Sequence, residues 1–189
     1  MTVPLALDLS LLPVALAGSG APLLKRLRLL DGESVPNLTV FAAAPDPALA
    51  EATGARLIPR LPDDSEIAAL RVLFVAGCPR AVAAALAATA RGHRVLVNVE
   101  DDLALCDFHV PAILRRGELA LSISTGGTSP TLSRRLRAHL EIAFPEHWAD
   151  RLRRIAELRQ HMRAAGASPA LVMAATEALI DEEGWLPRA

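Results

Sequence analysis

The alternation of short apolar runs with helical segments constrains the fold of this sequence more than any other feature. The runs are rich in β-forming residues, and the segments between the later ones are alanine-rich or amphipathic, as in 81–91. Strands that alternate with helices predict a parallel sheet with helices on both faces. We therefore predict an α/β fold whose strands lie at 13–17, 37–43, 55–60, 71–77, 94–100 and 119–125.

The character of the sequence changes after Pro130. Amphipathic segments follow one another at 131–144, 148–166 and 168–185, and they predict a helical region separate from the sheet. In the first of them leucines recur at helical spacing, a pattern that either pairs with a second copy or covers the parent domain. We expect a homodimer with a sheet domain at residues 1–110, a dimerisation and substrate region at 111–145 and a helical domain at 146–189.

Composition and charge narrow the classes of function. Lys and Arg number 20 against 21 Asp and Glu, the formal net charge is -1, and no long basic run is present to bind nucleic acid. Cys78 and Cys106 lack the spacing of a zinc knuckle and suit reduced thiols in the cytosol. A secretory signal needs a positive charge before its apolar run, but no Lys or Arg precedes Lys25. No apolar run approaches the roughly 20 residues of a membrane span, so we expect a cytoplasmic protein that binds neither nucleic acid nor membrane.

The segment GSGAPL, Gly18–Leu23, carries the first two glycines of the dinucleotide-binding fingerprint. It follows a predicted buried strand and opens a predicted helix, where glycine permits a tight turn and the close approach of a pyrophosphate. Leu23 takes the place of the third glycine, so a plain strand-to-helix turn that uses glycine stays open as the alternative. We predict a Rossmann-like domain whose cofactor-binding residues at this turn are Gly18, Ser19, Gly20, Ala21 and Pro22.

The end of the second predicted strand reads FAAAPD. An NAD site usually has an acid there for the ribose hydroxyls, but alanines occupy the position and Asp46 comes several residues late. Nothing basic in this stretch favours a 2′-phosphate. We therefore predict NAD rather than NADP, in contact with Ala43, Ala44 and Pro45.

A run of acids, Glu100 to Asp102, follows the strand predicted at 94–100. Ligands of open α/β sheets bind at the carboxyl ends of the strands, so one of these acids is a candidate general base. The alternative is a solvated loop that caps a helix. Cys106 and His109 lie close by in the sequence, but a lone histidine is more often structural, and we predict no metal site.

The stretch SISTGGTSPTLSRRLR, Ser122–Arg137, joins a strand-like run, a glycine turn and an arginine-rich helix. Ser129 followed by Pro130 predicts the N-cap and the first residue of that helix, and Gly126 and Gly127 allow a sharp turn. Unpaired N–H groups at a helix start, with arginines near them, predict a bound anion. A capped helix with solvated arginines is the alternative.

Taken in order, these motifs resemble the precorrin-2 dehydrogenase and sirohydrochlorin ferrochelatase family, the N-terminal module of siroheme synthase. The resemblance is strongest in 97–141, where VNVEDD, DFHVPAIL and SISTGGTSP precede the arginine-rich helix. It implies an enzyme that oxidises precorrin-2 to sirohydrochlorin with NAD, and in many members then inserts ferrous iron as the substrate of a chelatase step.

The resemblance also implies roles for particular residues. The family's key aspartate, a base in both steps, corresponds to Asp101, and the dinucleotide-contacting loop after the fourth strand corresponds to Gly77. Leu23 and the AGCPR segment at 76–80 depart from the family pattern, so a chelatase or carrier that has lost dehydrogenation stays the alternative. The many carboxylates of a tetrapyrrole suit a cationic helix start. The substrate-binding residues implied are Ser124, Gly126, Gly127, Thr128, Ser129 and Arg134.

Overall fold

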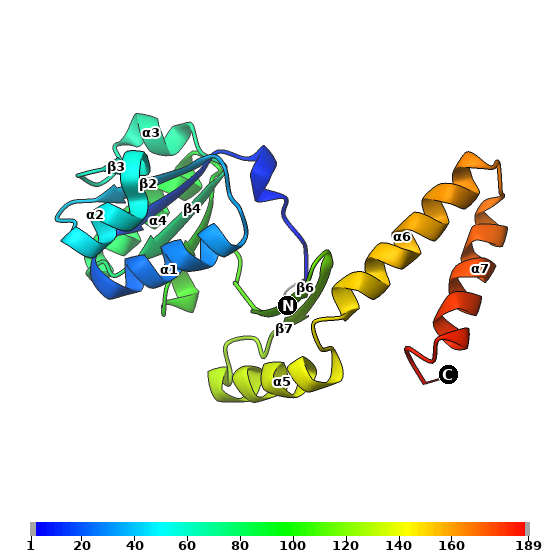
Figure 1. Cartoon of the computed structure of the whole chain (residues 1–189). Helices are drawn as coiled ribbons and strands as arrows, with labels where there is room; N and C mark the ends of the chain where they lie inside the picture. Colours follow the sequence, from blue (N-terminus) through cyan, green and yellow to red (C-terminus); the bar gives the residue numbers. More distant parts are fainter. Residues whose placement is uncertain (1–2, 188–189) are drawn as a thin grey trace. The chain divides into compact units, whose positions relative to one another are not determined.

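The computed structural model describes residues 3–187, which form two compact units (Figure 1). The first unit extends to Val110 and the second begins at Pro111. Each unit contains a sheet of its own.

Parallel strands form the sheet of the first unit, in the order β3-β2-β1-β4-β5. The chain therefore starts in the middle of the sheet, proceeds to one edge, and returns to the other side of β1. This reversal places the topological switch point between β1 and β4, which is where open α/β sheets bind ligands. The predicted α/β fold is confirmed. The bounds are β1 (Val14–Gly18), β2 (Leu38–Ala42), β3 (Leu57–Ile58), β4 (Val72–Ala76) and β5 (Leu96–Val99).

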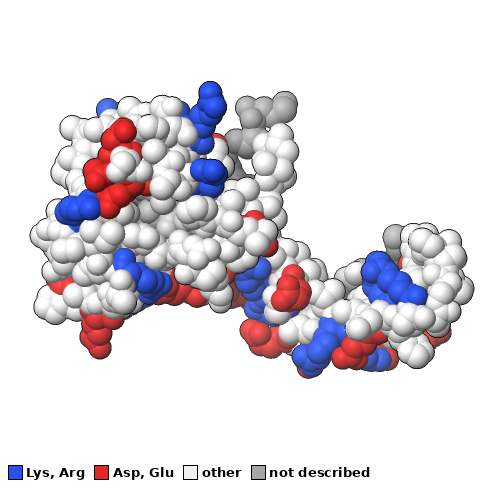
Figure 2. All heavy atoms as spheres, turned by 90° about the horizontal axis from the view of Figure 1, so that it is seen from above, with Lys and Arg blue, Asp and Glu red and all other residues white. Residues whose placement is uncertain are grey.

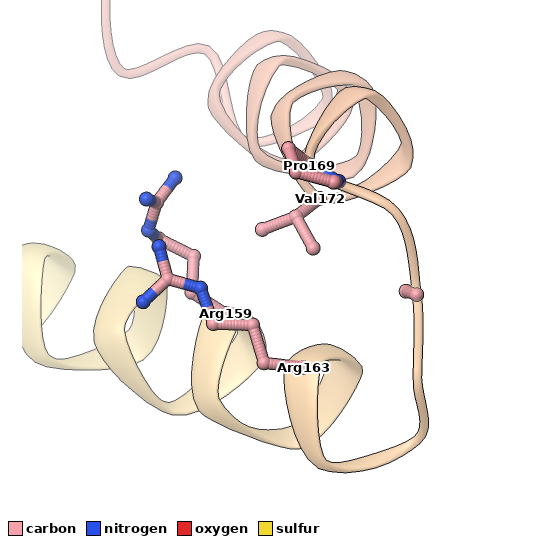
Figure 3. Close-up of a pocket in the computed structure, with 5 residues that line it drawn as sticks. Arg159, Arg163, Pro169 and Val172 are labelled. Atoms are coloured by element: carbon pink, nitrogen blue, oxygen red, sulfur yellow. The ribbon is translucent and has the colours of Figure 1, made fainter.

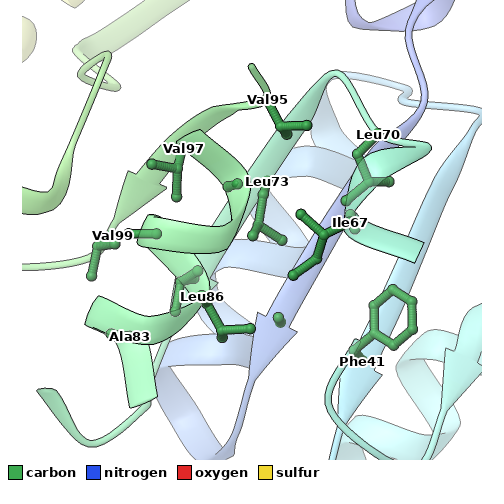
Figure 4. Close-up of a cluster of buried hydrophobic side chains, with 14 residues drawn as sticks. Phe41, Ile67, Leu70, Leu73, Ala83, Leu86, Val95, Val97 and Val99 are labelled. Atoms are coloured by element: carbon green, nitrogen blue, oxygen red, sulfur yellow. The ribbon is translucent and has the colours of Figure 1, made fainter. Parts of the chain in front are cut away.

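Helices cover both faces of this sheet. Successive side chains of a strand point to opposite faces, so Ala15 and Ala17 pack in one apolar cluster (Figure 4), while Val14 and Leu16 pack in the other. Because both faces are buried, the strands read as continuous apolar runs, the pattern from which they were predicted. The helices are α1 (Gly20–Gly32), α2 (Pro47–Thr53), α3 (Asp64–Ala68) and α4 (Arg80–Gly92), with short 3-10 turns η1 (Leu9–Leu11), η2 (Gly54–Arg56) and η3 (Leu103–Leu105).

The second unit begins with an antiparallel hairpin of β6 (Ala112–Arg116) and β7 (Leu119–Ile123). The prediction that the run at 119–125 joins the parallel sheet was therefore wrong. Two residues connect the strands, and the first, Gly117, has φ +61°, which suits a tight type II′ turn. So short a connection joins antiparallel neighbours only, because a parallel partner needs a long crossover.

The three predicted helices follow as α5 (Pro130–Ala143), α6 (Trp148–Ala164) and α7 (Pro169–Glu182). Gly166, with φ +77°, follows the end of α6. The Arg151 guanidinium lies 4.7 Å from the ring centroid of Trp148 and 5.4 Å from that of Trp185, so cation–π contacts help to hold Trp185 against α6.

A small hollow of about 110 Å³ separates α6 from the start of α7. Figure 3 shows the side chains of Arg159 and Arg163 in it, across from Pro169 and Val172. Over the face of the second unit seen in Figure 2, acidic and basic side chains are interspersed, in agreement with ion pairs such as Arg153–Asp150. Within residues 3–187, no helix has the length and apolar character needed to span a membrane.

Candidate active site

Two glycine-containing loops meet at the switch point of the parallel sheet. The backbone N–H of Ser19 donates to the carbonyl oxygen of Ala76 over 3.2 Å, and the Ser19 hydroxyl donates to that of Gly77 over 2.7 Å. A Cβ on Gly18 would lie 1.7 Å from the Ala76 carbonyl oxygen, and one on Gly77 would lie 2.1 Å from that of Ser19. Glycine at both positions is therefore what allows the loops after β1 and β4 to approach each other.

The start of α1 fits the phosphates of a dinucleotide. Ser19 is the N-cap residue, but its side chain does not cap the helix, because its hydroxyl is directed to Gly77. The first N–H groups of a helix have no acceptor within it and carry the positive end of the helix dipole. Gly20 has φ +65°, and a Cβ there would meet nothing closer than 3.8 Å, so the approach to the turn is open. Ala21 and Pro22 are exposed beside it.

Leu23, which replaces the third glycine of the fingerprint, is fully buried in the apolar cluster beneath α1. Its side chain therefore contributes to the packing of the helix on the sheet and leaves the turn unobstructed. The departure from the glycine pattern does not conflict with a dinucleotide site.

The end of β2 offers a small apolar surface. Ala43 and Ala44 are exposed and Pro45 is half-buried. Asp46, the late acid of this stretch, is the N-cap of α2, and its carboxylate accepts from the backbone N–H of Leu49 over 2.8 Å. The Asp46 carboxylate is thus engaged in helix capping. It follows Ala43 and Ala44, the alanines expected to contact the cofactor, in the sequence.

Asp101 has an uncommon backbone conformation. Its φ of +61° lies in the left-handed region, which few residues other than glycine adopt and which costs free energy. It lines a hollow of about 220 Å³ at the carboxyl ends of β4 and β5. The residues around the hollow are Cys78, Arg80, Ala83, Val99, Glu100, Asp101 and Asp102.

The neighbours of Asp101 are paired with cations. Arg80 donates from Nε to Oδ2 of Asp102 over 3.0 Å, and the Nζ atom of Lys25 lies 3.5 Å from Oε1 of Glu100. Oε2 of Glu100 is buried and has no hydrogen-bond partner among the described residues. Glu100 and Asp102 are therefore partly buried and ion-paired, whereas Asp101 between them is exposed.

Arg26 is a third cation near this loop, and like Lys25 it belongs to α1. The guanidinium of Arg26 is 5.8 Å from the centre of the Phe74 ring. Burial lowers the pKa of Arg26, while the charges of Glu100, Cys106 and Asp101 oppose that shift. Arg26 therefore interacts electrostatically with Glu100 and Asp101 at this end of β5.

The two cysteines have different surroundings. Burial raises the pKa of the Cys78 thiol, which lines the hollow. Burial also raises the pKa of Cys106, against the opposing effect of the backbone N–H of Val99, which donates to its Sγ over 3.2 Å. The Cys106 Sγ in turn lies 3.1 Å from the carbonyl oxygen of Val99, so this thiol stabilises the loop after β5. No group of three or more His, Cys, Asp and Glu side chains in the described part of the chain is arranged to hold a metal ion.

The predicted substrate turn belongs to the second unit, whereas Asp101 belongs to the first. Gly126 and Gly127 both have positive φ, +59° and +80°, and Ser124 and Thr128 are exposed. Ser129 caps α5 as predicted, since its Oγ accepts from the backbone N–H of Leu132 over 3.2 Å. Arg134 is exposed in the second turn of α5.

Sequence reasoning missed two residues of these loops. Thr125 organises the glycine turn, because its hydroxyl oxygen accepts from the backbone N–H of Ser129 and lies 3.2 Å from the Ser133 hydroxyl. Arg80 reaches the acid loop from the first residue of α4. The Thr-x-x-x-Ser spacing was a usable signal for the first, but the second needs the tertiary structure, because Arg80 and Asp102 are 22 positions apart.

The strand order, the glycine turn and the open start of α1 define a Rossmann-type dinucleotide-binding domain. The family model described as putative NAD(P)-binding matches residues 5–112, and this chain belongs to that family. A second model, described as sirohaem biosynthesis protein central, matches residues 116–141, which include the glycine turn and the start of α5.

Curated relatives carry both regions. The chain is 36% identical over 169 residues to a siroheme synthase of Methylococcus capsulatus, covering 88% of this chain and 36% of the relative. It is 33% identical over 159 residues to siroheme synthase 3 of Aeromonas hydrophila, covering 82% of this chain and 34% of the relative. The chain thus spans about a third of the length of these relatives, and its predicted resemblance to a siroheme synthase module is confirmed.

The structure also resembles a solved one, that of SirC, a precorrin-2 dehydrogenase. The TM-score is 0.76 at 22% sequence identity, and the match covers 98% of this chain and 92% of that chain. The two proteins share a fold, with a Rossmann-like domain followed by a helical part.

Proposed function

We propose that this protein oxidises precorrin-2 to sirohydrochlorin with NAD. The observation that carries the proposal is Asp101, held with φ +61° at the rim of a hollow of about 220 Å³ beside the loop of Gly77. A strained residue in a hollow at the carboxyl end of a parallel sheet is where chemistry is expected. The siroheme synthase relatives and the precorrin-2 dehydrogenase that shares the fold support the choice of a tetrapyrrole substrate.

The cofactor-binding residues of the proposal lie along the carboxyl edge of the sheet. The start of α1, at Gly20 and Ala21, binds the phosphates through its N–H groups. Ala43, Ala44 and Pro45 offer contact area for the adenosine, and Gly77 leaves room next to the hollow. When bound, NAD accepts a hydride from the substrate.

Asp101 removes the proton that balances this oxidation. The substrate loses two electrons and one hydrogen nucleus as the hydride, and a second proton goes from the ring to the Asp101 carboxylate. Lys25 and Arg80 pair with the two adjacent acids, so Asp101 is the member of the run that has no ion pair among the described residues.

The glycine turn of the second unit supplies the anion-binding residues of the proposal. Ser124, Thr128 and Arg134 are exposed and able to donate to substrate carboxylates. Gly126 and Gly127 keep the approach to the backbone free of side chains, and Ser129 fixes where α5 begins.

The test is an absorbance assay for sirohydrochlorin with purified protein, precorrin-2 and NAD. We expect Asp101→Asn to lower kcat by about 10²- to 10⁴-fold, the usual contribution of a general base, with little change in the KM for NAD. Asp64→Asn is the matched control, because Asp64 pairs with His93 just beyond the far end of α4. No NAD-dependent oxidation by the wild type would exclude dehydrogenation, and full activity in Asp101→Asn would exclude this base.

Ferrous iron insertion is the second reaction to examine, with iron as a substrate. Asp101 would there accept protons that leave the pyrrole nitrogens, which is the same use of one carboxylate at the same hollow. Adding ferrous iron to sirohydrochlorin without NAD separates the two reactions. Tetrapyrrole binding or iron insertion by a protein that does not bind NAD would favour a chelatase or carrier.

We also propose that residues 111–145 mediate homodimerisation and that residues 146–189 form a helical domain. In support, α5 has no buried residue in the described structure, and its Leu132, Leu136 and Ile142 are 49%, 41% and 82% exposed. Apolar faces of this kind pair in symmetric dimers. Light scattering of the wild type and of Leu136→Glu tests the proposed homodimer.

A cytoplasmic location is proposed from the free thiols Cys78 and Cys106.

A further inference from the structure

Arg80 occupies an unfavourable place for a cation. It is the first residue of α4, a helix of 13 residues whose N-cap is Pro79 and which has no acid in its first turn. The N-terminal end of a helix carries partial positive charge and disfavours a positive side chain. A guanidinium at this position therefore needs an anionic partner.

Within the protein, Asp102 accepts from only one of the N–H donors of the Arg80 guanidinium. Nε donates to Oδ2 of Asp102, and no residue of the described chain accepts from the two terminal nitrogens of Arg80. A guanidinium carries five N–H donors in a rigid fork, so four of them remain. The Arg80 side chain is 78% exposed, so these donors are open to a ligand.

Acidic side chains predominate around the hollow, and Arg80 is the cation that opposes them. Glu100, Asp101 and Asp102 all line the hollow, and Arg80 is the one cation among its lining residues as described. Lys25 and Arg26 approach Glu100 from α1 without lining it. A ligand with many carboxylates would meet repulsion from the acids unless one of its carboxylates reached Arg80.

We propose that Arg80 binds a carboxylate of the tetrapyrrole and so fixes the orientation of the ring over Asp101. This inference rests on the proposed function and assigns a substrate-binding residue to its site. The dinucleotide phosphates are a less suitable partner, because they are expected at Gly18–Pro22, and none of those residues lines the hollow.

The test is fluorescence titration of the full chain with sirohydrochlorin, and separately with NAD. We expect Arg80→Gln to weaken sirohydrochlorin binding by about 10- to 100-fold, the usual effect of losing a hydrogen bond to a charged group, with NAD binding changed less than about twofold. Arg80→Lys keeps the charge and loses the fork, so its affinity should lie between those of the wild type and Arg80→Gln.

Asp102→Asn is the control that distinguishes binding from positioning. It removes the charge that competes for Arg80, so sirohydrochlorin should bind as tightly as to the wild type or more tightly. Equal weakening by Arg80→Gln and Asp102→Asn would mean that the ion pair only holds the loop, and would overturn the proposal. Unfolding midpoints of the variants show whether each one is folded.

The titrations also separate this inference from the proposed function. Wild-type protein that binds and oxidises its substrate while Arg80→Gln behaves identically overturns the role of Arg80 alone. If the wild-type protein binds sirohydrochlorin but does not oxidise precorrin-2 with NAD, the proposed dehydrogenase activity is overturned. The ratio of the sirohydrochlorin affinities of the wild type and Arg80→Gln still decides the role of Arg80. No tetrapyrrole binding by the wild type overturns both.

Discussion

The hydroxyl of Ser19 donates to the carbonyl oxygen of Gly77 over 2.7 Å, although the two residues are 58 positions apart. This bond joins the loop after β1 to the loop after β4, and the backbone N–H of Ser19 adds a second link to Ala76. A serine that would otherwise cap α1 is thereby used to hold two loops together. The free start of the helix and the position of the Gly77 loop are consequences of the same contact.

Gly77→Ala tests how closely these loops must approach. The new Cβ would lie 2.1 Å from the carbonyl oxygen of Ser19 at a residue with φ +69°, so the loops must separate. We expect the free energy of unfolding of the first unit to fall by about 1–3 kcal/mol, and NAD binding to weaken. Urea unfolding and calorimetry with NAD measure the two effects. Gly92→Ala, where a Cβ meets nothing within 4 Å, should leave both unchanged or slightly improved.

Asp101→Gly tests whether the backbone at the proposed base is strained. Glycine adopts φ +61° without the steric cost that aspartate bears. We expect this variant to unfold at a higher urea concentration, with a gain of about 0.5–1 kcal/mol, while losing oxidation of precorrin-2. A gain in stability with a loss of activity is the signature of strain retained for function.

Ser34→Gly is the matched control for that gain. Ser34 has φ +53° in the turn after α1, outside the hollow beside Asp101. The Ser34→Gly variant should gain about as much stability as Asp101→Gly and should keep full activity. If Asp101→Gly instead destabilises the protein while Ser34→Gly stabilises it, the aspartate makes contacts that outweigh its strain.

Most of the first unit was predictable because local sequence determines it. Continuous apolar runs identify strands buried on both faces, and the predicted runs overlap β1, β2, β4 and β5 closely. Ser129 and Pro130 specified the start of α5 through capping chemistry that involves only neighbouring residues.

The errors and omissions concern relations between distant residues. The run at 119–125 was correctly predicted to be a strand, but its pattern does not show which strand it pairs with. The tight turn at Gly117 makes it pair with β6. The ion pair of Arg80 with Asp102 and the left-handed backbone of Asp101 depend on how loops meet. Such features have no local signature in the sequence.

Cys78 offers a measure of ligand occupancy. It is half-buried in the hollow, and burial raises the pKa of its thiol from the ordinary value of 9.0. Since the thiolate is the reactive form, alkylation by iodoacetamide should be slow at pH 7 and should still be accelerating above pH 9. Sirohydrochlorin should slow the reaction by filling the hollow. Mass spectrometry of the modified peptide identifies the cysteine, and Cys78→Ser removes the signal. A rate that levels off below pH 8 would contradict the raised pKa.

The start of α3 should make the first unit sensitive to acid. Arg60 donates to both carboxylate oxygens of Glu66, over 2.6 and 2.7 Å, and Asp63 and Glu66 form a reciprocal capping box. The Arg60 hydrogen bonds lower the pKa of Glu66 from 4.5, and the backbone N–H of Glu66 lowers that of Asp63 from 3.8. Because the folded pKa values lie below the unfolded ones, this stabilisation is complete above about pH 5 and is lost as the pH falls through the folded values. Glu66→Gln keeps the capping geometry without the charge, so the urea midpoint should fall less steeply between pH 5 and pH 3 than in the wild type. Glu51→Gln, at an exposed glutamate of α2 that has no ion pair among the described residues, should reproduce the wild-type slope, and an equally shallow slope there would assign the effect to net charge.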